Sequence, residues 1–295
     1  MSYEMLNQFL EQTGRFALTW HAGQGDAFAP ITLNCYRPAG VSANAPVVLV
    51  QHGVLRNGDD YRDFWIPAAD RYGLQIVAPT FSNEAWKGLG SYNNGSVLDD
   101  DGLLRDRAHW SYQAILNLVQ ALRSAQVLQA QPVYLFGHSA GGQFVHRLVS
   151  TLGAQDFAGV VAGNPGWYTL PDMGLPFPEG MGGVGLDNSA LQRLLSTPLV
   201  ILAGDQDIDT SDPNLPAEPA ALRQGPHRFA RAHHYYAAGQ AAAQKLGIPL
   251  AWTLHTVPGI GHNGHAMSHV CAHLWFEGRM PDAAWLQQWI GSHAA

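Results

Sequence analysis

The 295-residue chain has few charged residues and hardly any lysine. Asp, Glu, Lys and Arg together make up 13% of the sequence, and its only lysines are Lys87 and Lys245. The formal net charge is −7 and the arginines are scattered, so no basic run predicts a groove for nucleic acid or a surface for anionic membranes. We therefore expect neither nucleic acid nor a membrane among its partners. Hydrophobic residues reach 46%, which argues against a disordered chain.

Cysteine is equally scarce, and long apolar runs are absent. Cys35 and Cys271 stand far apart in apolar surroundings, which predicts free buried thiols rather than a disulfide framework or a metal site. No apolar stretch approaches the roughly 18 residues of a membrane-spanning helix. Residues 1–14 contain Glu4 and Glu11 and no basic residue, so they lack the charged start and apolar middle of a signal peptide. A cytoplasmic location is the resulting expectation.

Short aliphatic runs alternate with helical patterns along the chain. The runs, which predict strands buried on both faces, are Ala45–Gln51, Leu74–Pro79, Pro132–Phe136, Phe157–Ala162, Pro198–Ala203 and Leu250–Val257. Two earlier segments also predict strands: Arg15–Ala22, in which bulky and polar residues alternate, and Ile31–Arg37. The helical patterns are Tyr61–Tyr72, Ala108–Ala125, Gly141–Leu152, His227–Leu246, His265–Phe276 and Asp282–Ile290. This alternation predicts a single α/β domain over residues 1–295, with a mostly parallel sheet and helices on both faces.

Two stretches interrupt the alternation. Residues 164–197 hold Trp167, Tyr168 and other large side chains among glycines and prolines, and residues 208–226 are rich in Asp and Pro. Long irregular segments in compact domains are usually functional. We expect 164–197 to be a lid or cap insertion and 208–226 to be a second irregular loop, with decorative surface insertions as the alternative.

The strongest motif is the sequence GHSAGG, residues 137–142. It fits the G-x-S-x-G nucleophile elbow, because an aliphatic strand pattern leads into it and a helical pattern leads out of it. A serine on such a tight turn needs small neighbours, which Gly137 and Gly141 provide. The motif therefore predicts Ser139 as a nucleophile, with a glycine-rich packing turn as the alternative.

A serine nucleophile requires a base and an acid that orients the base. In folds that carry such an elbow, the three residues occur along the chain in the order Ser, acid, His. After the strand pattern Pro198–Ala203 comes a loop with three acids, of which we favour Asp207 over Asp205 and Asp209. These three acids do not fit a calcium loop, since Gly and Glu are missing at the required positions.

The base is predicted from its place in the chain, because there are fourteen histidines. His262 follows the last strand pattern on a glycine-flanked loop and precedes a helical pattern. His265, His269 and His273 recur at four-residue spacing and could bind zinc, but they lack the glutamate of an H-E-x-x-H motif. We expect them to form a polar helix face, and we expect no metal and no other cofactor.

An oxyanion hole needs backbone N–H groups directed at the developing charge. We predict Ala140, the residue after the nucleophile, and Val54, on the loop that begins His52-Gly53 after the first aliphatic run. We expect His52 to hold that loop rather than to take part in catalysis. Candidate substrate-binding residues are Trp167 and Tyr168 in the 164–197 insertion, together with Trp86 and Tyr92, with ordinary packing as the alternative.

The order of these motifs resembles the serine-nucleophile α/β-hydrolases over essentially the whole chain. The motifs are QHG, GHSAGG, GDQD and VPGIGH, and the stretch HGVLRNGDDYRDFW followed by IVAPTF is also similar to poly(3-hydroxybutyrate) depolymerase-like esterases. The resemblance implies an α/β-hydrolase fold with an eight-stranded sheet. A serine nucleophile is wrong for the haloalkane dehalogenases, epoxide hydrolases and dienelactone hydrolases of this superfamily.

The function expected from these residues is hydrolysis of a carboxylic ester through an acyl-enzyme intermediate. The expected substrate is a small to medium ester, with hydroxyalkanoate-type esters among the candidates. An acyltransferase, a peptidase and a hydroxynitrile lyase can share the same triad, so the fold does not decide among them. A non-catalytic scaffold for ligand binding is the alternative from a different class, and the oligomeric state is left open.

Overall fold

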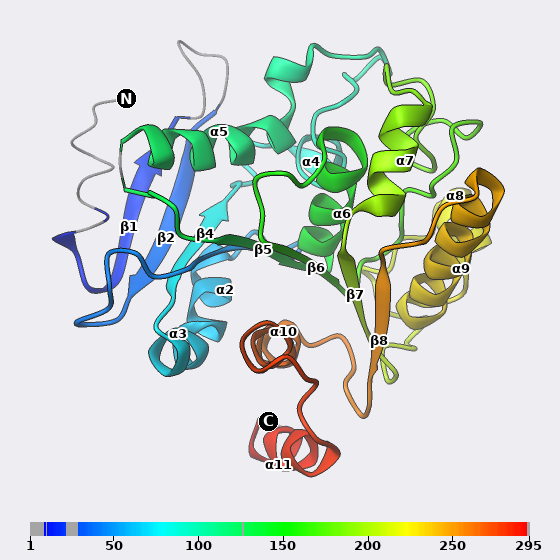
Figure 1. Ribbon diagram of the computed structural model, residues 1–295. Coiled ribbons are helices and arrows are strands. Elements are labelled where there is room, and N and C mark those ends of the chain that lie inside the picture. Colours follow the sequence, from blue (N-terminus) through cyan, green and yellow to red (C-terminus); the bar gives the residue numbers. More distant parts are fainter. Residues whose placement is uncertain (1–8, 10, 22–28, 126, 294–295) are drawn as a thin grey trace.

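An eight-stranded sheet forms the centre of the computed structural model, which describes residues 9, 11–21, 29–125 and 127–293 (Figure 1). In chain order the strands are β1 (Gly14–Trp20), β2 (Ile31–Arg37), β3 (Val47–Gln51), β4 (Gln75–Thr80), β5 (Val133–His138), β6 (Gly159–Gly163), β7 (Leu199–Gly204) and β8 (Thr253–Val257). Their order in the sheet is β1-β2-β4-β3-β5-β6-β7-β8, and only β2 runs against its neighbours. The predicted mostly parallel sheet is confirmed.

The burial of the strands follows their sequence patterns. All five residues of β3 are buried, as expected for an aliphatic run between two helix layers. In β1 the burial alternates, with Phe16, Leu18 and Trp20 facing the core. This strand ends at Trp20, and Ala22, at the end of the predicted segment, lies outside the described residues, as do most of residues 1–14.

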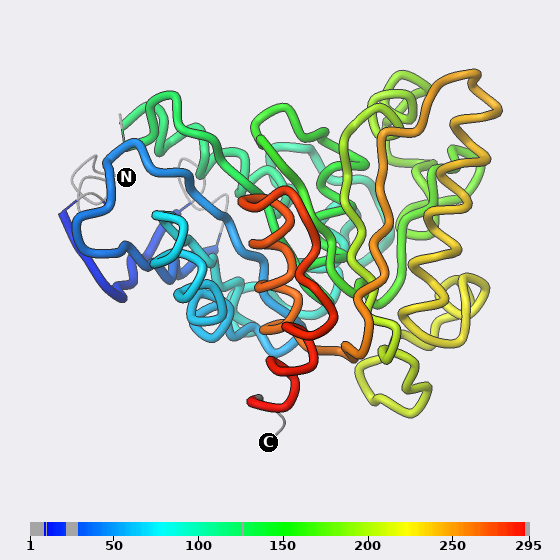
Figure 2. The backbone as a smooth tube through the Cα atoms, turned by 60° about the horizontal axis from the view of Figure 1, so that its bottom comes forward, coloured from blue at the N-terminus to red at the C-terminus, as the bar shows by residue number. Residues whose placement is uncertain are grey.

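Helices cover both faces of the sheet. One face carries α4 (Gly88–Ser91), α5 (Ser111–Ser124), α6 (Ala140–Leu152), α7 (Asn188–Ser196), α8 (Pro219–Gln224) and α9 (Arg228–Leu246), and the short 3-10 helix η1 (Arg107–His109) precedes α5. The other carries α2 (Gly58–Phe64), α3 (Ile66–Tyr72), α10 (Gly264–Glu277) and α11 (Ala283–His293). Figure 2 brings this second face forward and shows the C-terminal segment lying across it. Each face has its own hydrophobic core, and Cys35 and Cys271 are buried free thiols, one in each core.

Two predictions of local structure were wrong. The helix predicted over Tyr61–Tyr72 is interrupted at Trp65, so that α2 and α3 are separate. Residues 164–197 and 208–226 are not wholly irregular, because they contain α7 and α8. The Asp187 side chain begins α7 by accepting hydrogen bonds from the Ser189 and Ala190 N–H groups. Among the described residues, no helix is long and apolar enough to span a membrane.

Candidate active site

Ser139 lies on the turn between β5 and α6, at the carboxyl edge of the parallel strands. Its φ of 60° and ψ of −119° place it in a region that L-residues rarely adopt. The turn is fixed by backbone hydrogen bonds, since the Ser139 N–H donates to the Gly163 carbonyl at 2.9 Å and the Ser139 carbonyl accepts from the Gln143 N–H at 3.0 Å. The strained backbone thus projects the serine side chain beyond the sheet edge.

Glycines allow this turn to close. A Cβ atom at Gly137 would overlap the Gly141 carbonyl, and one at Gly141 would overlap the Gln51 carbonyl of β3. At Gly142 a Cβ would meet the Gly163 carbonyl at 2.8 Å. The first helical turn of α6 can therefore lie directly against β3 and β6 only because these positions carry no side chain.

The structure places Ser139, His262 and Asp207 in one hydrogen-bonded chain. Ser139 Oγ lies 2.9 Å from His262 Nε2, and His262 Nδ1 lies 2.7 Å from Asp207 Oδ2. The Asp207 side chain is 2% exposed and the His262 side chain 26% exposed, so the carboxylate is buried while the imidazole reaches the open side of the site. This arrangement can take a proton from the serine hydroxyl and stabilise the imidazolium that results.

The other two acids of this loop accept hydrogen bonds from other loop residues. Asp205 accepts a hydrogen bond from the Gly259 N–H at 2.7 Å, and Asp209 accepts from both the N–H and the hydroxyl of Ser211. Neither makes a hydrogen bond to His262 within the described part of the chain. Asp209 thus makes an Asx turn, as short acidic side chains commonly do in loops, whereas Asp205 joins its loop to the segment after β8.

Asn164, at the end of β6, joins the acid loop to the histidine loop. Its Oδ1 accepts a hydrogen bond from the Gly204 N–H at 2.9 Å, and its Nδ2 donates to the Gly261 carbonyl at 3.0 Å. The side chain is buried and its φ is 43°. The sequence analysis did not single it out, although a polar residue directly after a buried parallel strand, like Ser139 and Asp205, marks the same edge of the sheet.

Arg228, the first residue of α9, was also missed. Its side chain is 1% exposed, and Nη1 lies 2.7 Å from Asp212 Oδ2 and 3.5 Å from Asp207 Oδ1. The Phe229 N–H donates to the Asp207 carbonyl, so the start of α9 holds Asp207 through its main chain as well. Burial would raise the pKa of Asp212, but hydrogen bonds from the Asn214 N–H and Arg228 outweigh burial and lower it.

Val54 and Ala140, the two residues predicted to form the oxyanion hole, lie beside Ser139. Val54 and Ala140 both line the same cavity as Ser139, and neither backbone N–H is hydrogen-bonded within the described residues. Ala140 opens α6, where unpaired N–H groups and the helix dipole favour negative charge. His52 holds the preceding loop, since its Nε2 accepts from the Phe81 N–H at 3.1 Å. Burial lowers the pKa of His52 to about 3, so the ring is neutral.

Other histidines crowd this region without joining the triad. His138 is buried, with Nδ1 2.9 Å from the Tyr61 hydroxyl and its ring 4.6 Å from the His262 ring. Burial lowers its pKa well below the usual value, so it carries no charge beside His262. His265 and His269 contact each other and the Trp289 ring, and His265 stacks on Phe64. No group of three or more metal-ligating side chains occurs in the part of the chain that the structure describes.

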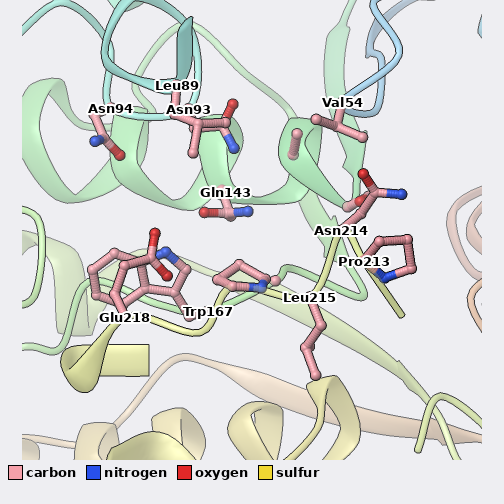
Figure 3. Close-up of a pocket in the computed structure, with 14 residues that line it drawn as sticks. Val54, Leu89, Asn93, Asn94, Gln143, Trp167, Pro213, Asn214, Leu215 and Glu218 are labelled. Atoms are coloured by element: carbon pink, nitrogen blue, oxygen red, sulfur yellow. The ribbon is translucent and has the colours of Figure 1, made fainter. Parts of the chain in front are cut away.

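Two cavities open on either side of Ser139. The first, the Trp167 pocket, has a volume of about 220 Å³ (Figure 3) and is lined by Val54, Leu89, Asn93, Asn94, Ser139, Ala140, Gln143, Gly166, Trp167, Pro213, Asn214, Leu215, Pro216 and Glu218. The second, the Phe64 pocket, has a volume of about 210 Å³ and is lined by Gly53, Val54, Leu55, Asn57, Tyr61, Phe64, His138, Ser139, Asn214, His262 and Gly264. They share Val54, Ser139 and Asn214.

Of the four aromatic residues proposed to bind substrate, only Trp167 lines either cavity. Trp86 donates from its indole N–H to the Pro30 carbonyl, and Tyr92 donates from its hydroxyl to the His52 carbonyl. Tyr168 is buried and stacks on Tyr235. These three rings fill the core because burying large aromatic faces stabilises the fold, whichever loop they come from.

The segments that were expected to cover the site contribute unequally. Residues 213–218 of the second loop supply five of the residues lining the Trp167 pocket, whereas the 164–197 insertion supplies Gly166 and Trp167. Later parts of that insertion, including Phe177 and Met181, are buried in the core. The loop over 208–226 is therefore the main cover of this cavity.

Comparison with solved structures relates this site to known hydrolases. A poly(3-hydroxybutyrate) depolymerase from Bordetella parapertussis is 56% identical, covers 98% of this chain and 99% of its own, and superposes with a TM-score of 0.93. Poly(aspartic acid) hydrolase-1 from Sphingomonas sp. KT-1 is 33% identical, with 89% and 98% covered and a TM-score of 0.84. The chain belongs to the serine α/β-hydrolases.

The identification also fits more distant structures. An S-formylglutathione hydrolase from Agrobacterium tumefaciens, 18% identical, shares the fold with a TM-score of 0.54 over 90% of this chain and 95% of its own. No protein-family model and no curated protein matches the sequence. The 56% identity to the depolymerase makes this α/β-hydrolase an enzyme of the serine carboxylesterase type.

Proposed function

We propose that this α/β-hydrolase cleaves carboxylic esters through Ser139, His262 and Asp207 and a covalent acyl-enzyme. The observation that carries the proposal is the continuous hydrogen-bonded chain from Ser139 Oγ through His262 to Asp207, with both contacts below 3 Å. Val54 and Ala140, whose backbone N–H groups make no hydrogen bond within the described residues, line the same cavity. A nucleophile, a base with its orienting acid and an oxyanion site are the parts that acyl transfer requires.

In the first half-reaction Ser139 Oγ attacks the ester carbonyl carbon while His262 Nε2 accepts its proton. The carbonyl oxygen becomes an oxyanion, which accepts hydrogen bonds from the Val54 and Ala140 N–H groups. Asp207 accepts the His262 Nδ1–H hydrogen bond and stabilises the imidazolium. The C–O bond to the alcohol then breaks, and Nε2–H protonates the departing oxygen. In the second half-reaction a water, deprotonated by His262, releases the acid and restores Ser139.

The proposed substrate is a small to medium ester, including esters of hydroxyalkanoates. The cavity of about 220 Å³ beside Ser139 suits a short acyl or alcohol group. The similarity to a poly(3-hydroxybutyrate) depolymerase at 56% identity supports a hydroxyacid ester. Catalysis in this proposal needs no metal or other cofactor.

The proposal is tested by replacing the nucleophile. The Ser139→Ala enzyme should unfold at the same temperature as the wild type and lose at least about 10³-fold in hydrolysis of ethyl butyrate. A fluorophosphonate should phosphonylate Ser139 Oγ with loss of fluoride, so that the wild type gains the mass of the phosphonyl group and the variant does not. Wild-type turnover by Ser139→Ala, or labelling that persists in it, would exclude the proposed nucleophile.

Amide hydrolysis is a second candidate, favoured by the 33% identity to a poly(aspartic acid) hydrolase. Amides and esters pass through similar tetrahedral intermediates, so the same residues could act on both. Measuring kcat/KM for butyramides and for ethyl butyrate with the same enzyme preparation distinguishes the two activities. Faster turnover of the amide would replace the ester as the proposed substrate.

A further inference from the structure

The loop between β3 and α2 carries Val54, and a buried tyrosine holds the start of this loop. The His52 carbonyl accepts a hydrogen bond from the Tyr92 hydroxyl at 2.8 Å, and the Tyr92 side chain is fully buried. In a trans peptide the C=O and the N–H of the next residue point in opposite directions, so the Gly53 N–H points away from Tyr92. The first peptide group of the loop is therefore fixed from its carbonyl side.

The hydroxyl of a second tyrosine, Tyr61 of α2, lies on the other side of this peptide group. A Cβ atom at Gly53 would lie 2.8 Å from the Tyr61 oxygen, so only a glycine lets the loop approach it this closely. The Gly53 N–H donates to that oxygen, which lowers the pKa of Tyr61, while burial raises the same pKa by more. The phenol is therefore un-ionised at neutral pH and keeps its own hydrogen to donate.

The Tyr61 hydroxyl also contacts the nucleophile elbow. Its oxygen lies 2.9 Å from Nδ1 of His138, the residue before Ser139. Because burial lowers the pKa of His138 well below its usual value, the ring is neutral and one of its nitrogens can accept the Tyr61 hydrogen. A single hydroxyl thus links the loop that supplies Val54 to the elbow that supplies Ala140.

The next peptide group of the loop contains the Val54 N–H itself. The Gly53 carbonyl of this group lies 2.9 Å from His52 Nδ1 and accepts from the Arg56 N–H at 3.2 Å. Since His52 Nε2 accepts from the Phe81 N–H, Nδ1 carries the ring hydrogen and donates it to the Gly53 carbonyl. The Val54 N–H points the opposite way, and it makes no hydrogen bond within the described residues.

We propose that the Tyr61 and Tyr92 hydroxyls are positioning groups for the oxyanion hole. By holding the peptide group before Gly53 from opposite sides, they set the direction of the Val54 N–H. The inference rests on the proposed ester hydrolysis and adds two groups that act through the main chain. Tyr92 lines neither cavity, so its hydroxyl can act only through the loop. A rotated peptide would weaken binding of the transition state and leave binding of the ester unchanged.

The test removes each hydroxyl and keeps the ring. In Tyr61→Phe and in Tyr92→Phe, kcat for ethyl butyrate should fall about tenfold, which is part of the roughly 10²–10³-fold that loss of a whole oxyanion donor costs. KM should stay within about twofold of the wild-type value. Rates are expressed per active site, counted by fluorophosphonate labelling of Ser139. Tyr72→Phe is the matched control, because it removes a hydroxyl that donates to Glu277 at 2.6 Å and lines neither cavity.

A tetrahedral analogue gives a second measurement, which a merely structural role would not change. The ketone 1,1,1-trifluoro-2-pentanone carries the chain of a butyryl group. Ser139 Oγ adds to its carbonyl carbon while His262 takes the hydroxyl proton, and the resulting oxyanion occupies the oxyanion hole. The inhibition constant of this ketone should rise in proportion to the fall in kcat/KM in both variants, and it should stay unchanged in Tyr72→Phe.

The possible outcomes separate this inference from the proposed function. No hydrolysis by the wild type would reject the proposed function, whereas wild-type kcat and ketone binding in both tyrosine variants would reject only the positioning role. A higher KM with unchanged kcat would make the hydroxyls substrate contacts, and an equal loss in Tyr72→Phe would make them general supports of the fold. Either result overturns the inference. If Tyr61→Phe does not fold, Tyr92→Phe, which keeps the contact between Tyr61 and His138, decides alone.

Discussion

The serine and the acid of this site are held in place by different means. Ser139 is positioned by the backbone: glycines let α6 approach β3 and β6, and main-chain hydrogen bonds fix the turn. The Asp207 carboxylate, by contrast, is held by side chains that come from elsewhere in the sequence, those of His262 and Arg228. Local constraints can be recognised in a short motif, whereas a cluster of buried charges becomes apparent only in three dimensions.

The largest expected effect concerns the acid itself. Asp207→Asn should lower kcat for ester hydrolysis about 10⁴-fold, the loss found when the corresponding aspartate of a serine protease triad becomes asparagine, because the imidazole is then held in the wrong tautomer. Steady-state kinetics on ethyl butyrate would measure it. Asp205→Asn is the matched control, since an asparagine still accepts the Gly259 N–H hydrogen bond. If both variants lose activity equally, the assignment of Asp207 is wrong.

Gly141→Ala tests the positioning of Ser139 by the backbone. Its new methyl group would overlap the main chain at the end of β3, so we expect the free energy of unfolding to fall by about 3 kcal/mol and activity about 100-fold. Urea unfolding and kinetics give both values. Gly90→Ala is the control, because a Cβ there meets nothing within 4 Å. Wild-type stability in Gly141→Ala would contradict the packing described for the turn.

The positioning of Asp207 by side chains is tested at Arg228, a positioning residue. Arg228→Met should lower kcat about tenfold or more, since Asp207 and Asp212 lose the cation between them. KM should stay near the wild-type value, because Arg228 lines neither pocket. Arg223→Met, which breaks an exposed pair with Glu179, should change neither kcat nor KM. Equal losses of kcat in the two variants would contradict a positioning role for Arg228.

Lowering the pH should remove the stabilising contributions of the serine region and of the acid region at different pH values. Burial lowers the pKa of His138 and His146 well below the unfolded value of about 6.5, so the unfolded chain binds protons that the folded chain does not. Stability on the serine side is therefore complete above about pH 6.5 and falls as the pH drops. Asp212, whose pKa is also lowered, contributes above about pH 3.9 and is lost only below it.

Urea unfolding at pH 7, 6 and 5 measures this difference. A buried neutral histidine contributes up to about 1.4 kcal/mol per pH unit to the slope. His146→Gln should remove that amount between pH 6 and 5, and the exposed His109→Gln should leave the slope unchanged. An identical slope in the wild type and in His146→Gln would show that the His146 ring does not stay neutral on folding.

The same contrast explains what the sequence could predict. The strands and the elbow were predictable because aliphatic runs and G-x-S-x-G are contiguous, and the order of the motifs along the chain pointed to Asp207 and His262. The roles of Asn164 and Arg228 were not predictable. Asn164 joins the loop after β7 to the distant loop that contains Gly261, and no local pattern marks the arginine at the start of α9. Trp86, Tyr92 and Tyr168 were misplaced because an aromatic ring in a loop reads the same whether it fills the core or borders a cavity.

Asn214 connects these regions in a way that limits how the enzyme can change. It lines both pockets beside Ser139, and its N–H donates to Asp212, which Arg228 anchors next to Asp207. A substitution that shifts this loop therefore acts on the fit of the substrate in both pockets and on the placement of the acid together. Evolution or design can widen the substrate range independently only through walls that the pockets do not share, such as Asn93 on one side and Leu55 on the other.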